Sequence, residues 1–290
     1  MRIDADQNLR SLRQAAMLSR ATAGRRGMTV HLAPETAADV LVSGDLHGNL
    51  FNLQALLKLA DLDMNPQRHL VLQEFVHGTA RYPDGGCRSH RMLDVLAALK
   101  SRHPHRLHLI MGNHELAQWT GRKVAKDDVY FNDLFEEGVR SCYGPRAEEM
   151  IEAYDQLFSS MLLAVRLPNR VFICHSIPEG RHLASFDVGL FEQMGLREED
   201  LENKASLYHL VWGRDTRAET ARKFAEMVDA EILITGHIAQ EAGYGLPSDA
   251  HLILDSMASP AAYALIPTSE SIPPTSLKEF VRLLPHGTRI

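Results

Sequence analysis

Five short segments of the sequence carry side chains that can bind metal ions. In chain order they are SGDLHGN with Asp45 and His47, QEFVHG with Glu74 and His77, GNHE with Asn113, His114 and Glu115, ICHS with His175, and TGH with His237. Carboxylate, amide and imidazole groups without a thiolate suit manganese, iron or zinc. A carboxylate between two ions can bridge them, and Glu74 is the candidate for this bridge.

Each segment follows a short apolar run, which predicts how its side chains are held. Such β-rich runs lie at 39–43, 69–76, 106–111, 170–174 and 231–235, with one more at 251–255. Apolar residues at three- and four-residue spacing predict helices between several runs, and Thr216 with Glu219 predicts a capping box opening one of them. Strands that alternate with helices indicate an α/β fold, in which ligands gather at the carboxyl ends of strands.

Taken singly, each segment also has an ordinary structural explanation. An Asp-x-His sequence after a strand is usually a turn, and a single histidine such as His175 or His237 is more often a half-buried structural residue than a ligand. The chain has 15 histidines, so some fall beside strands by chance. Five ligand-bearing strand ends in succession are much harder to explain in this way, and together they predict a site for two metal ions.

The composition is that of a soluble globular protein. Of 290 residues, 45% are hydrophobic and 23% are charged, and the net charge of −6 argues against nucleic-acid binding. No apolar stretch is long enough for a membrane span, and the first residues lack the apolar region of a secretory signal. Three scattered cysteines do not form a disulfide framework, so a cytoplasmic location is expected. The oligomeric state is left open.

The segments GDLHGN, GNHE, ICHS and TGH resemble the metallophosphoesterase (calcineurin-like) superfamily. LVWGRD at 210–215 and the unit AETARKFAEMVDAEILITGH are similar to segments of the same family, and the resemblance covers roughly residues 38–266. Many metallophosphoesterases carry Gly-His-x-His here, whereas this chain has Ala239 at the second histidine position. The sequence is therefore most similar to the phosphoprotein phosphatase branch or its dinucleoside-polyphosphatase relatives.

The resemblance implies a fold of two mixed β-sheets packed face to face, with helices outside. It places the metallophosphoesterase domain at residues 35–266. Residues 1–34 are rich in Arg, Ala and Gln and are expected to form a helical or partly disordered extension, and residues 267–290, with several Pro and Ser, are expected to form a loose C-terminal strap.

The resemblance also implies roles for the candidate residues. Asp45 and His47 bind one metal ion, Asn113, His175 and His237 bind the other, and Glu74 is shared. A hydroxide that bridges the two ions attacks phosphorus directly, Asn113 helps to bind the phosphate, and His114 protonates the leaving oxygen. The implied cofactors are two divalent ions, manganese or alternatively iron or zinc, and the implied partner is a phosphorylated small molecule or phosphoprotein.

The second motif departs from the family pattern Gly-Asp-x-Val-Asp-Arg-Gly. Glu74 replaces the bridging aspartate, and His77 stands where the family has the aspartate that orients the general-acid histidine. The arginine of this motif is absent, and Met111 replaces the arginine that usually precedes Gly-Asn-His-Glu. Because arginine forks suit phosphate oxygens, their loss weakens substrate binding. Arg81 and Arg214 are the candidates to replace them.

Three functions are compatible with the sequence. The first is a metal-dependent phosphatase that acts on a phosphomonoester, which includes a serine or threonine phosphoprotein. The second is hydrolysis of a phosphoanhydride such as a dinucleoside polyphosphate. The third, motivated by Glu74 and His77, is a degenerate member that binds metal or a phosphorylated ligand with little turnover.

Overall fold

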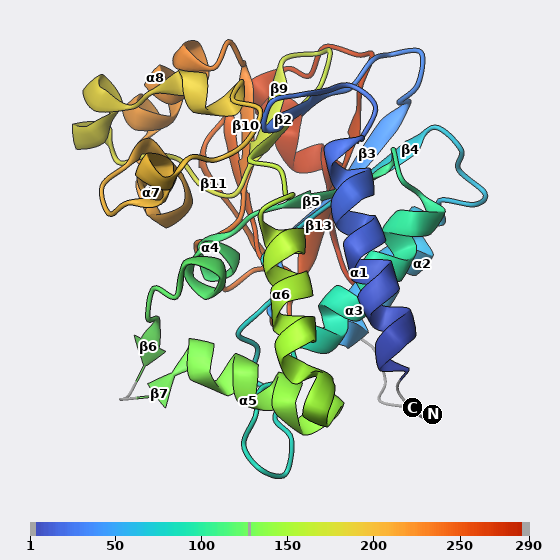
Figure 1. The fold of residues 1–290 in the computed structure, drawn as a ribbon. Coiled ribbons are helices and arrows are strands. Elements are labelled where there is room, and N and C mark those ends of the chain that lie inside the picture. The colour runs from blue at the N-terminus through green and yellow to red at the C-terminus, as the bar shows by residue number, and fades with distance from the viewer. Residues whose placement is uncertain (1–3, 127–128, 286–290) are drawn as a thin grey trace.

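Two mixed β-sheets pack face to face at the centre of the molecule (Figure 1). The computed structural model describes residues 4–126 and 129–285. The larger sheet consists, in spatial order, of β1 (Arg25–Arg26), β2 (Thr29–His31), β8 (Ala164–Arg166), β9 (Val171–Cys174), β10 (Ile232–Thr235), β12 (His251–Leu254) and β11 (Tyr244–Ser248). The smaller consists of β14 (Val281–Leu283), β13 (Ala262–Pro267), β3 (Asp39–Asp45), β4 (Arg68–Gln73) and β5 (Leu107–Ile110).

Helices cover the outer faces of both sheets. The helices α1 (Ala5–Arg20), α2 (Leu50–Ala60), α3 (His90–Arg102) and α6 (Ala147–Phe158) lie on one flank, and α7 (Ser206–Trp212) and α8 (Ala218–Met227) lie on the other (Figure 1). Two further helices, α4 (Asn113–Thr120) and α5 (Phe131–Tyr143), are separated by the short hairpin of β6 (Ala125–Lys126) and β7 (Val129–Tyr130). The predicted fold of two mixed sheets flanked by helices is confirmed.

The alternation of side chains along the strands builds two cores. Val40, Val42 and Val71 of the smaller sheet pack between the sheets, together with β-branched residues of the larger sheet such as Ile173 and Ile234. Their neighbours in sequence, mostly leucine and phenylalanine, turn outward and pack against the helices. A strand buried on both faces reads as a continuous apolar run, which explains why these strands could be found from sequence. Each fully buried side chain of this size stabilises the fold by about 1.5–3 kcal/mol.

The strand directions bring the predicted polar segments to one edge. β3, β4 and β5 run parallel to one another in the smaller sheet, and β9, β10 and β12 run parallel in the larger. A parallel bridge between Asp45 and Asp255 connects the ends of β3 and β12, so the two sheets present their carboxyl ends together. Gly44 permits this approach, because a Cβ atom there would lie 2.1 Å from the carbonyl oxygen of Leu254.

The two terminal segments pack against the body. Within the expected extension 1–34, α1 buries Leu9, Leu12 and Ala15 against the helices of its flank, and β2 pairs with β8 in the larger sheet. Within the expected strap 267–290, the 3-10 helix Pro274–Phe280 leads into β14, which pairs with β13. Residues 1–3 of the expected extension and 286–290 of the expected strap lie outside the described residues. The division into three parts stays a prediction.

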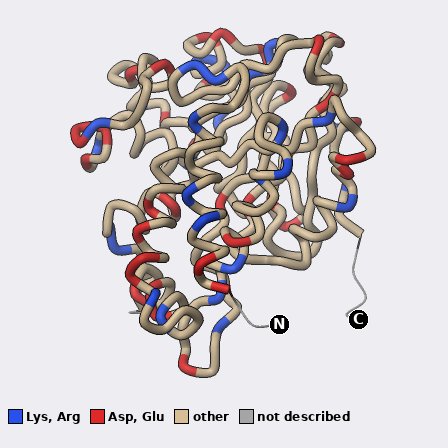
Figure 2. The backbone as a smooth tube through the Cα atoms, turned by 45° about the vertical axis from the view of Figure 1, so that its right-hand side comes forward, with Lys and Arg blue, Asp and Glu red and all other residues tan. Residues whose placement is uncertain are grey.

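The helices carry charges of both signs on their exposed sides. Acidic and basic positions are interspersed over the lower helical part of the view in Figure 2. There Arg146 pairs with Asp6 of α1 at 2.6 Å and with Glu149 of α6 at 2.5 Å, so exposed ion pairs contribute modestly to the α1–α6 contact. Among the described residues, every helix is too short or too polar to cross a membrane.

Two local predictions are wrong. The second strand was expected to reach residue 76, but β4 ends at Gln73 because Glu74 adopts a positive φ of 50°. The capping box of Thr216 and Glu219 does not form. Helix α8 begins after Arg217, and the Asp215 carboxylate instead accepts hydrogen bonds from the backbone N–H of Arg217 and from the hydroxyl of Thr220, both at 2.9 Å.

Candidate metal site

The carboxylate and imidazole side chains predicted at the strand ends converge on one cluster. Asp45, His47 and Glu74 offer three ligand atoms within 4.8 Å of one another, and Glu74, His175 and His237 offer a second set at the same spacing. Glu74 belongs to both sets. Such an arrangement can hold two cations that share one carboxylate.

The second set closes around Nε2 of His175. This atom lies 3.1 Å from Oε2 of Glu74, 3.1 Å from Oδ1 of Asn113 and 3.2 Å from Nδ1 of His237. A single N–H can satisfy only one of three such partners. In addition, Nε2 of His237 and Nδ2 of Asn113 are buried without a hydrogen-bond partner. A cation could be bound at once by the oxygen atoms of Glu74 and Asn113 and by the imidazole nitrogens, so the residues present fit a metal ion.

The first set is held by backbone hydrogen bonds. His47 directs Nδ1 to the carbonyl oxygen of Val76 at 2.9 Å, which leaves Nε2 facing Oε2 of Glu74 at 4.0 Å. Both carboxylate oxygens of Asp45 accept from the backbone N–H of His237 at 3.0 Å. The ligand atoms of His47 and Asp45 are therefore oriented by backbone groups that are not themselves ligands, as in known metal sites.

The buried charges of the cluster perturb one another strongly. Burial and the charge of Glu74 raise the pKa of Asp45 to about 7. Burial alone favours the neutral imidazole of His175, yet Glu74 and Asp45 raise its pKa to about 9. Burial opposes ionisation of Glu74, but the imidazoles of His175, His114 and His47 bring its pKa well below the usual range. Two carboxylates held this close and this deep favour a bound cation.

Backbone strain gathers at the same place. His47, Glu74, His77 and His237 all have positive φ, between 42° and 66°. Each such residue costs of order 1–3 kcal/mol and persists only where surrounding contacts enforce it. Three of these four residues, His47, Glu74 and His237, belong to the ligand sets, and His77 lies in the loop beside them.

Glu115 of GNHE braces the loop that presents Glu74. Its fully buried carboxylate accepts from the backbone N–H of Phe75 at 2.7 Å, of Val76 at 3.0 Å and of Gly112 at 3.0 Å. The backbone N–H of His114, in the first turn of α4, donates to Oε1 of Glu74 at 2.8 Å. Glu115 therefore connects the β4 loop to α4.

Sequence analysis missed two glutamines of the site. Oε1 of Gln73 faces Nδ1 of His175 at 2.9 Å, so it orients that ring with Nε2 toward the cluster. Gln118 lies four residues after His114 on α4 and faces the ring of His77. The i, i+4 spacing of His114 and Gln118 was the available signal, because such residues share a helix face. Gln73 gave a weaker signal, a polar residue that ends an apolar strand.

The remaining predicted residues lie around the cluster. His114 packs edge-on against His47, with ring centroids 4.8 Å apart. Burial lowers the pKa of His114 to about 3. Arg214 is exposed and donates from Nη1 to the carbonyl oxygen of His237 at 3.1 Å. Arg81 donates to the carbonyl oxygens of Gly78 and Ala80, which are backbone atoms of the loop after His77.

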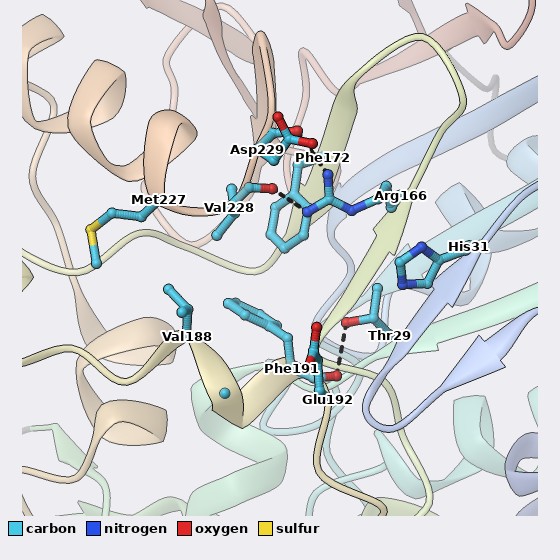
Figure 3. Close-up of a pocket in the computed structure, with 11 residues that line it drawn as sticks. Thr29, His31, Arg166, Phe172, Val188, Phe191, Glu192, Met227, Val228 and Asp229 are labelled. Atoms are coloured by element: carbon cyan, nitrogen blue, oxygen red, sulfur yellow. Dashed lines mark hydrogen bonds between the residues drawn. The ribbon is translucent and has the colours of Figure 1, made fainter.

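A separate cavity of about 260 Å³ lies between the strands β2, β8 and β9, the segment 188–192 and the C-terminal end of α8 (Figure 3). Its guanidinium group, from Arg166, lies 5.2 Å above the Phe172 ring and donates to the carbonyl oxygens of Val228 and Asp229. None of the candidate ligands lines this cavity. The chemistry of the molecule therefore concentrates at the strand ends.

Comparison with known proteins identifies the family. Residues 38–241 match the calcineurin-like phosphoesterase family, which is most of the chain. The chain belongs to this family, which confirms the resemblance found in the sequence motifs. Members of the family bind divalent metal ions, in agreement with the donor set found here.

Curated relatives that match the chain carry phosphatase names. A probable serine/threonine-protein phosphatase of Encephalitozoon cuniculi is 24% identical over 228 residues, which cover 72% of this chain and 44% of the relative. Serine/threonine-protein phosphatase 5 of Solanum lycopersicum is 22% identical over 237 residues, which cover 73% of this chain and 37% of the relative. The chain thus spans less than half the length of the curated relatives that it matches.

Two solved structures share the fold. A protein serine/threonine phosphatase from Saccharomyces cerevisiae, described as similar to human phosphatase PP5, superposes with a TM-score of 0.71 at 14% identity and covers 99% of this chain and 92% of its own. A cold-active protein-tyrosine phosphatase of a Shewanella species superposes with a TM-score of 0.59 at 15% identity, over 92% and 84%.

Proposed function

We propose that this protein is a phosphatase that hydrolyses a phosphomonoester with two divalent metal ions bound at the carboxyl ends of its central strands. The observation that carries the proposal is the pair of ligand sets that share Glu74. The relatives named as serine/threonine phosphatases support a phosphoprotein as one class of substrate.

Each ion has its own ligands in this proposal. Asp45 and His47 hold the first, Asn113, His175 and His237 hold the second, and Glu74 is shared. Manganese is the proposed metal, with iron or zinc as alternatives, because all donors are oxygen or imidazole nitrogen. When bound, the two ions supply activation of water and neutralisation of phosphoryl charge.

The chain's own residues complete the reaction. Asn113 donates from its unpaired Nδ2 to a phosphoryl oxygen. His114 is the proposed proton-transfer residue, which delivers a proton to the leaving oxygen as the phosphorus–oxygen bond breaks. Arg214 clamps the phosphate, because it is exposed beside His237 and its guanidinium makes, within the part of the chain that the structure describes, a single hydrogen bond, to the backbone carbonyl of His237. Arg81, in the loop after His77, is a second clamp.

A small aromatic pocket beside the cluster gives room for the rest of the substrate. Trp212 packs edge-on against His237, with centroids 6.5 Å apart, and lines a hollow of about 180 Å³. The stacked rings of His182 and His209, 3.8 Å apart, and the ring of Tyr208 line it as well, together with Glu179, Arg181 and Gly213. Aromatic walls next to a phosphate site favour a leaving group with a flat or apolar part.

The test is hydrolysis of p-nitrophenyl phosphate by purified protein with added manganese. We expect turnover that needs the metal and that His114→Ala abolishes. Unaltered turnover in this variant contradicts the role of His114. A panel of phosphopeptides beside diadenosine tetraphosphate then separates a phosphomonoesterase from a phosphoanhydride hydrolase, and faster hydrolysis of the anhydride would overturn the proposed substrate class.

The proposal takes residues 35–266 as the catalytic domain, since all candidate ligands lie within it. A cytoplasmic location is part of the same proposal. It is supported by Cys87, Cys142 and Cys174, which are all unpaired.

A further inference from the structure

A further cavity lies at the amino ends of the strands of the smaller sheet, at the opposite edge from the candidate metal ligands. Its volume is about 570 Å³, more than twice that of the cavity lined by Arg166. This size falls within the range of about 300–1,000 Å³ that is typical of small-molecule sites. Its walls come from the turn after α1, the chain after β2 and the loops before β4 and β5. The cavity thus lies where the N-terminal segment meets the smaller sheet.

Arg106 gives the wall of this cavity a fixed cationic group. Its Nη1 atom donates to the carbonyl oxygens of Leu62 and Asn65 at 2.7 Å and 2.9 Å. Its Nη2 atom donates to Nδ1 of His103 at 3.1 Å. In the part of the chain that the structure describes, these bonds use three of the five N–H groups of the guanidinium. Arg106 is therefore held in place and keeps donors for a ligand.

Two neutral side chains of the wall add further donors. Nδ1 of His105 accepts from the backbone N–H of Ala23 at 3.2 Å, so the neutral ring carries its proton on Nε2. The amide nitrogen of Gln67 donates one hydrogen to the carbonyl oxygen of Glu35 at 3.2 Å and keeps the second. His105 and Gln67 both line the cavity and are both exposed, so a ligand can reach these donors.

The charged groups in the wall and behind it are mainly positive. Glu35 is the one carboxylate among the described lining residues, beside the guanidinium of Arg106 and three imidazoles. Behind the wall, Lys100 is 1% exposed and donates to the hydroxyl of Thr22 at 2.9 Å and to the carbonyl oxygen of Leu107 at 2.7 Å. Within the described ranges, neither Arg106 nor Lys100 forms an ion pair with a carboxylate.

The pKa values of two lining histidines reflect the same excess of positive charge. Burial, with the charges of Arg106 and Lys100 among the smaller causes, lowers the pKa of His69 to about 4. Burial, followed by the charge of Arg26, lowers the pKa of His31 as well. A ligand with a negative charge offsets these repulsions, whereas a cationic ligand adds to them.

We propose that this cavity binds a small organic anion with an apolar body. Arg106 and His105 hold the charged group of the ligand. Its body packs on Leu32, Ala33 and Pro66, which also line the cavity. Binding needs neither metal ions nor hydrolysis, so the inference is independent of the proposed phosphatase activity. The bound ligand connects the turn after α1 to the loops before β4 and β5.

Two ligands of similar shape test the role of the negative charge. Calorimetric titration of the full chain, freed of metal ions with a chelator, compares 2-naphthoate with the neutral 2-naphthamide. We expect saturable binding of one 2-naphthoate per chain. We expect 2-naphthamide to bind about tenfold more weakly, because a hydrogen bond to an ionised group is roughly twice as strong as one between neutral groups.

Two substitutions in the wall should change the affinity for 2-naphthoate in opposite directions. His105→Glu places a negative charge beside the ligand and should weaken binding about tenfold. Glu35→Gln removes the lining carboxylate and should strengthen binding about threefold, a smaller effect because Glu35 is exposed. Damage to the fold does not produce tighter binding, so the Glu35→Gln result separates the effect of charge from structural damage.

Substitutions that fill a cavity test where the ligand binds. Ala33→Trp places a large ring in the cavity and should abolish the binding of 2-naphthoate. Ala38→Trp is the matched control, because Ala38 is also exposed but does not line the cavity, and it should bind as the wild type does. His182→Glu changes the aromatic hollow beside the candidate metal site and should leave the affinity unchanged.

Three results would overturn the proposal. The first is a wild-type chain that does not bind 2-naphthoate, and the second is equal affinity for 2-naphthoate and 2-naphthamide. The third is weaker binding in His182→Glu together with unchanged binding in His105→Glu and Ala33→Trp, which places the ligand in the aromatic hollow instead. Thermal unfolding of each variant shows whether the fold is retained.

Discussion

The two ends of the smaller sheet both bury histidines, but they give them different partners. At the carboxyl ends of the strands, His175, which follows β9 of the larger sheet, faces Glu74 and Asp45 of the smaller sheet across 3.1 Å and 3.8 Å. Near the amino ends of β4 and β5, His69 and His108 lie with parallel rings 5.1 Å apart and share one hydrogen bond of 2.8 Å. The first end mixes carboxylates with imidazoles, and the second pairs imidazole with imidazole.

The electrostatics of the two ends differ accordingly. At the amino end, burial lowers the pKa of His69 to about 4, and burial followed by the charge of Arg25 lowers the pKa of nearby Lys100 to about 7. Lys100 is satisfied by neutral acceptors, the hydroxyl of Thr22 at 2.9 Å and the carbonyl oxygen of Leu107 at 2.7 Å. This end favours neutral groups, whereas the carboxyl end keeps opposite charges buried. Buried histidines alone are therefore a poor indicator of function. The carboxylates beside them distinguish a candidate metal site from a structural histidine pair.

The largest effect is expected from removing the shared carboxylate. Glu74→Gln keeps the shape of the side chain but removes the charge common to both ligand sets, so at least one metal ion should be lost and kcat/KM should fall about a thousandfold. The measurement is metal content by mass spectrometry after dialysis, together with p-nitrophenyl phosphate turnover. His69→Gln, at the other end of the sheet, is the control and should bind metal as the wild type does. Equal metal content in Glu74→Gln and wild type would contradict the shared role.

The histidine pair at the amino end should affect the stability of the fold in acid rather than the catalytic activity. The pKa of His69 is lower in the folded state than the ordinary value of 6.5, so the unfolded chain binds more protons between these two values. Stability is therefore full above about pH 6.5 and is lost as the pH falls toward 4, with His69 contributing on the order of 3 kcal/mol. Urea unfolding of metal-free protein at pH 7 and pH 4.5 measures this loss. His69→Phe should reduce it, and the exposed His105→Phe should leave it unchanged.

Much of the fold could be predicted because a strand buried on both faces has a continuous apolar sequence. All six apolar runs are strands, and the runs at 39–43 and 170–174 identify β3 and β9 to within a few residues. The element boundaries that the sequence did not predict are set by the local backbone conformation and by tertiary contacts. The end of β4 depends on the positive φ of Glu74, and the start of α8 depends on Asp215, which bonds across the turn to Arg217 and Thr220.

The candidate site was predictable where side chains have specific chemistry. Aspartate, glutamate and histidine at the strand ends were sufficient to predict the cluster from the sequence alone. Gln73 and Gln118 were not found, because an amide serves equally well in turns, caps and exposed positions. Their roles follow only from the rings that they face, His175 and His77, which the fold brings to them.

Gln73 offers a sharper test of how the carboxyl end is organised. Gln73→Leu removes the acceptor that orients His175, and a lost partner of this kind typically lowers metal affinity or activity about 10- to 100-fold. Titration with manganese, followed by turnover, gives the affinity. Gln67→Leu is the matched control, because Gln67 is exposed at the amino end and its side-chain amide donates to the carbonyl oxygen of Glu35, far from the cluster. Similar manganese affinities in the two variants would mean that His175 needs no support from Gln73.

The smallest expected effect compares an arginine from each end. Arg106, at the amino end, donates to the carbonyl oxygens of Leu62 and Asn65 at 2.7 Å and 2.9 Å, whereas the exposed Arg214 makes one bond of 3.1 Å beside His237. Arg214→Ala should therefore raise KM for p-nitrophenyl phosphate about tenfold, since a charged hydrogen bond to phosphate is worth about 1.5–3 kcal/mol, with little change in melting temperature. Arg106→Ala should lower the melting temperature and leave KM unchanged. An unchanged KM in Arg214→Ala would contradict the role of Arg214 and leave Arg81 as the phosphate-binding candidate. Measuring KM for Arg81→Ala then tests that assignment.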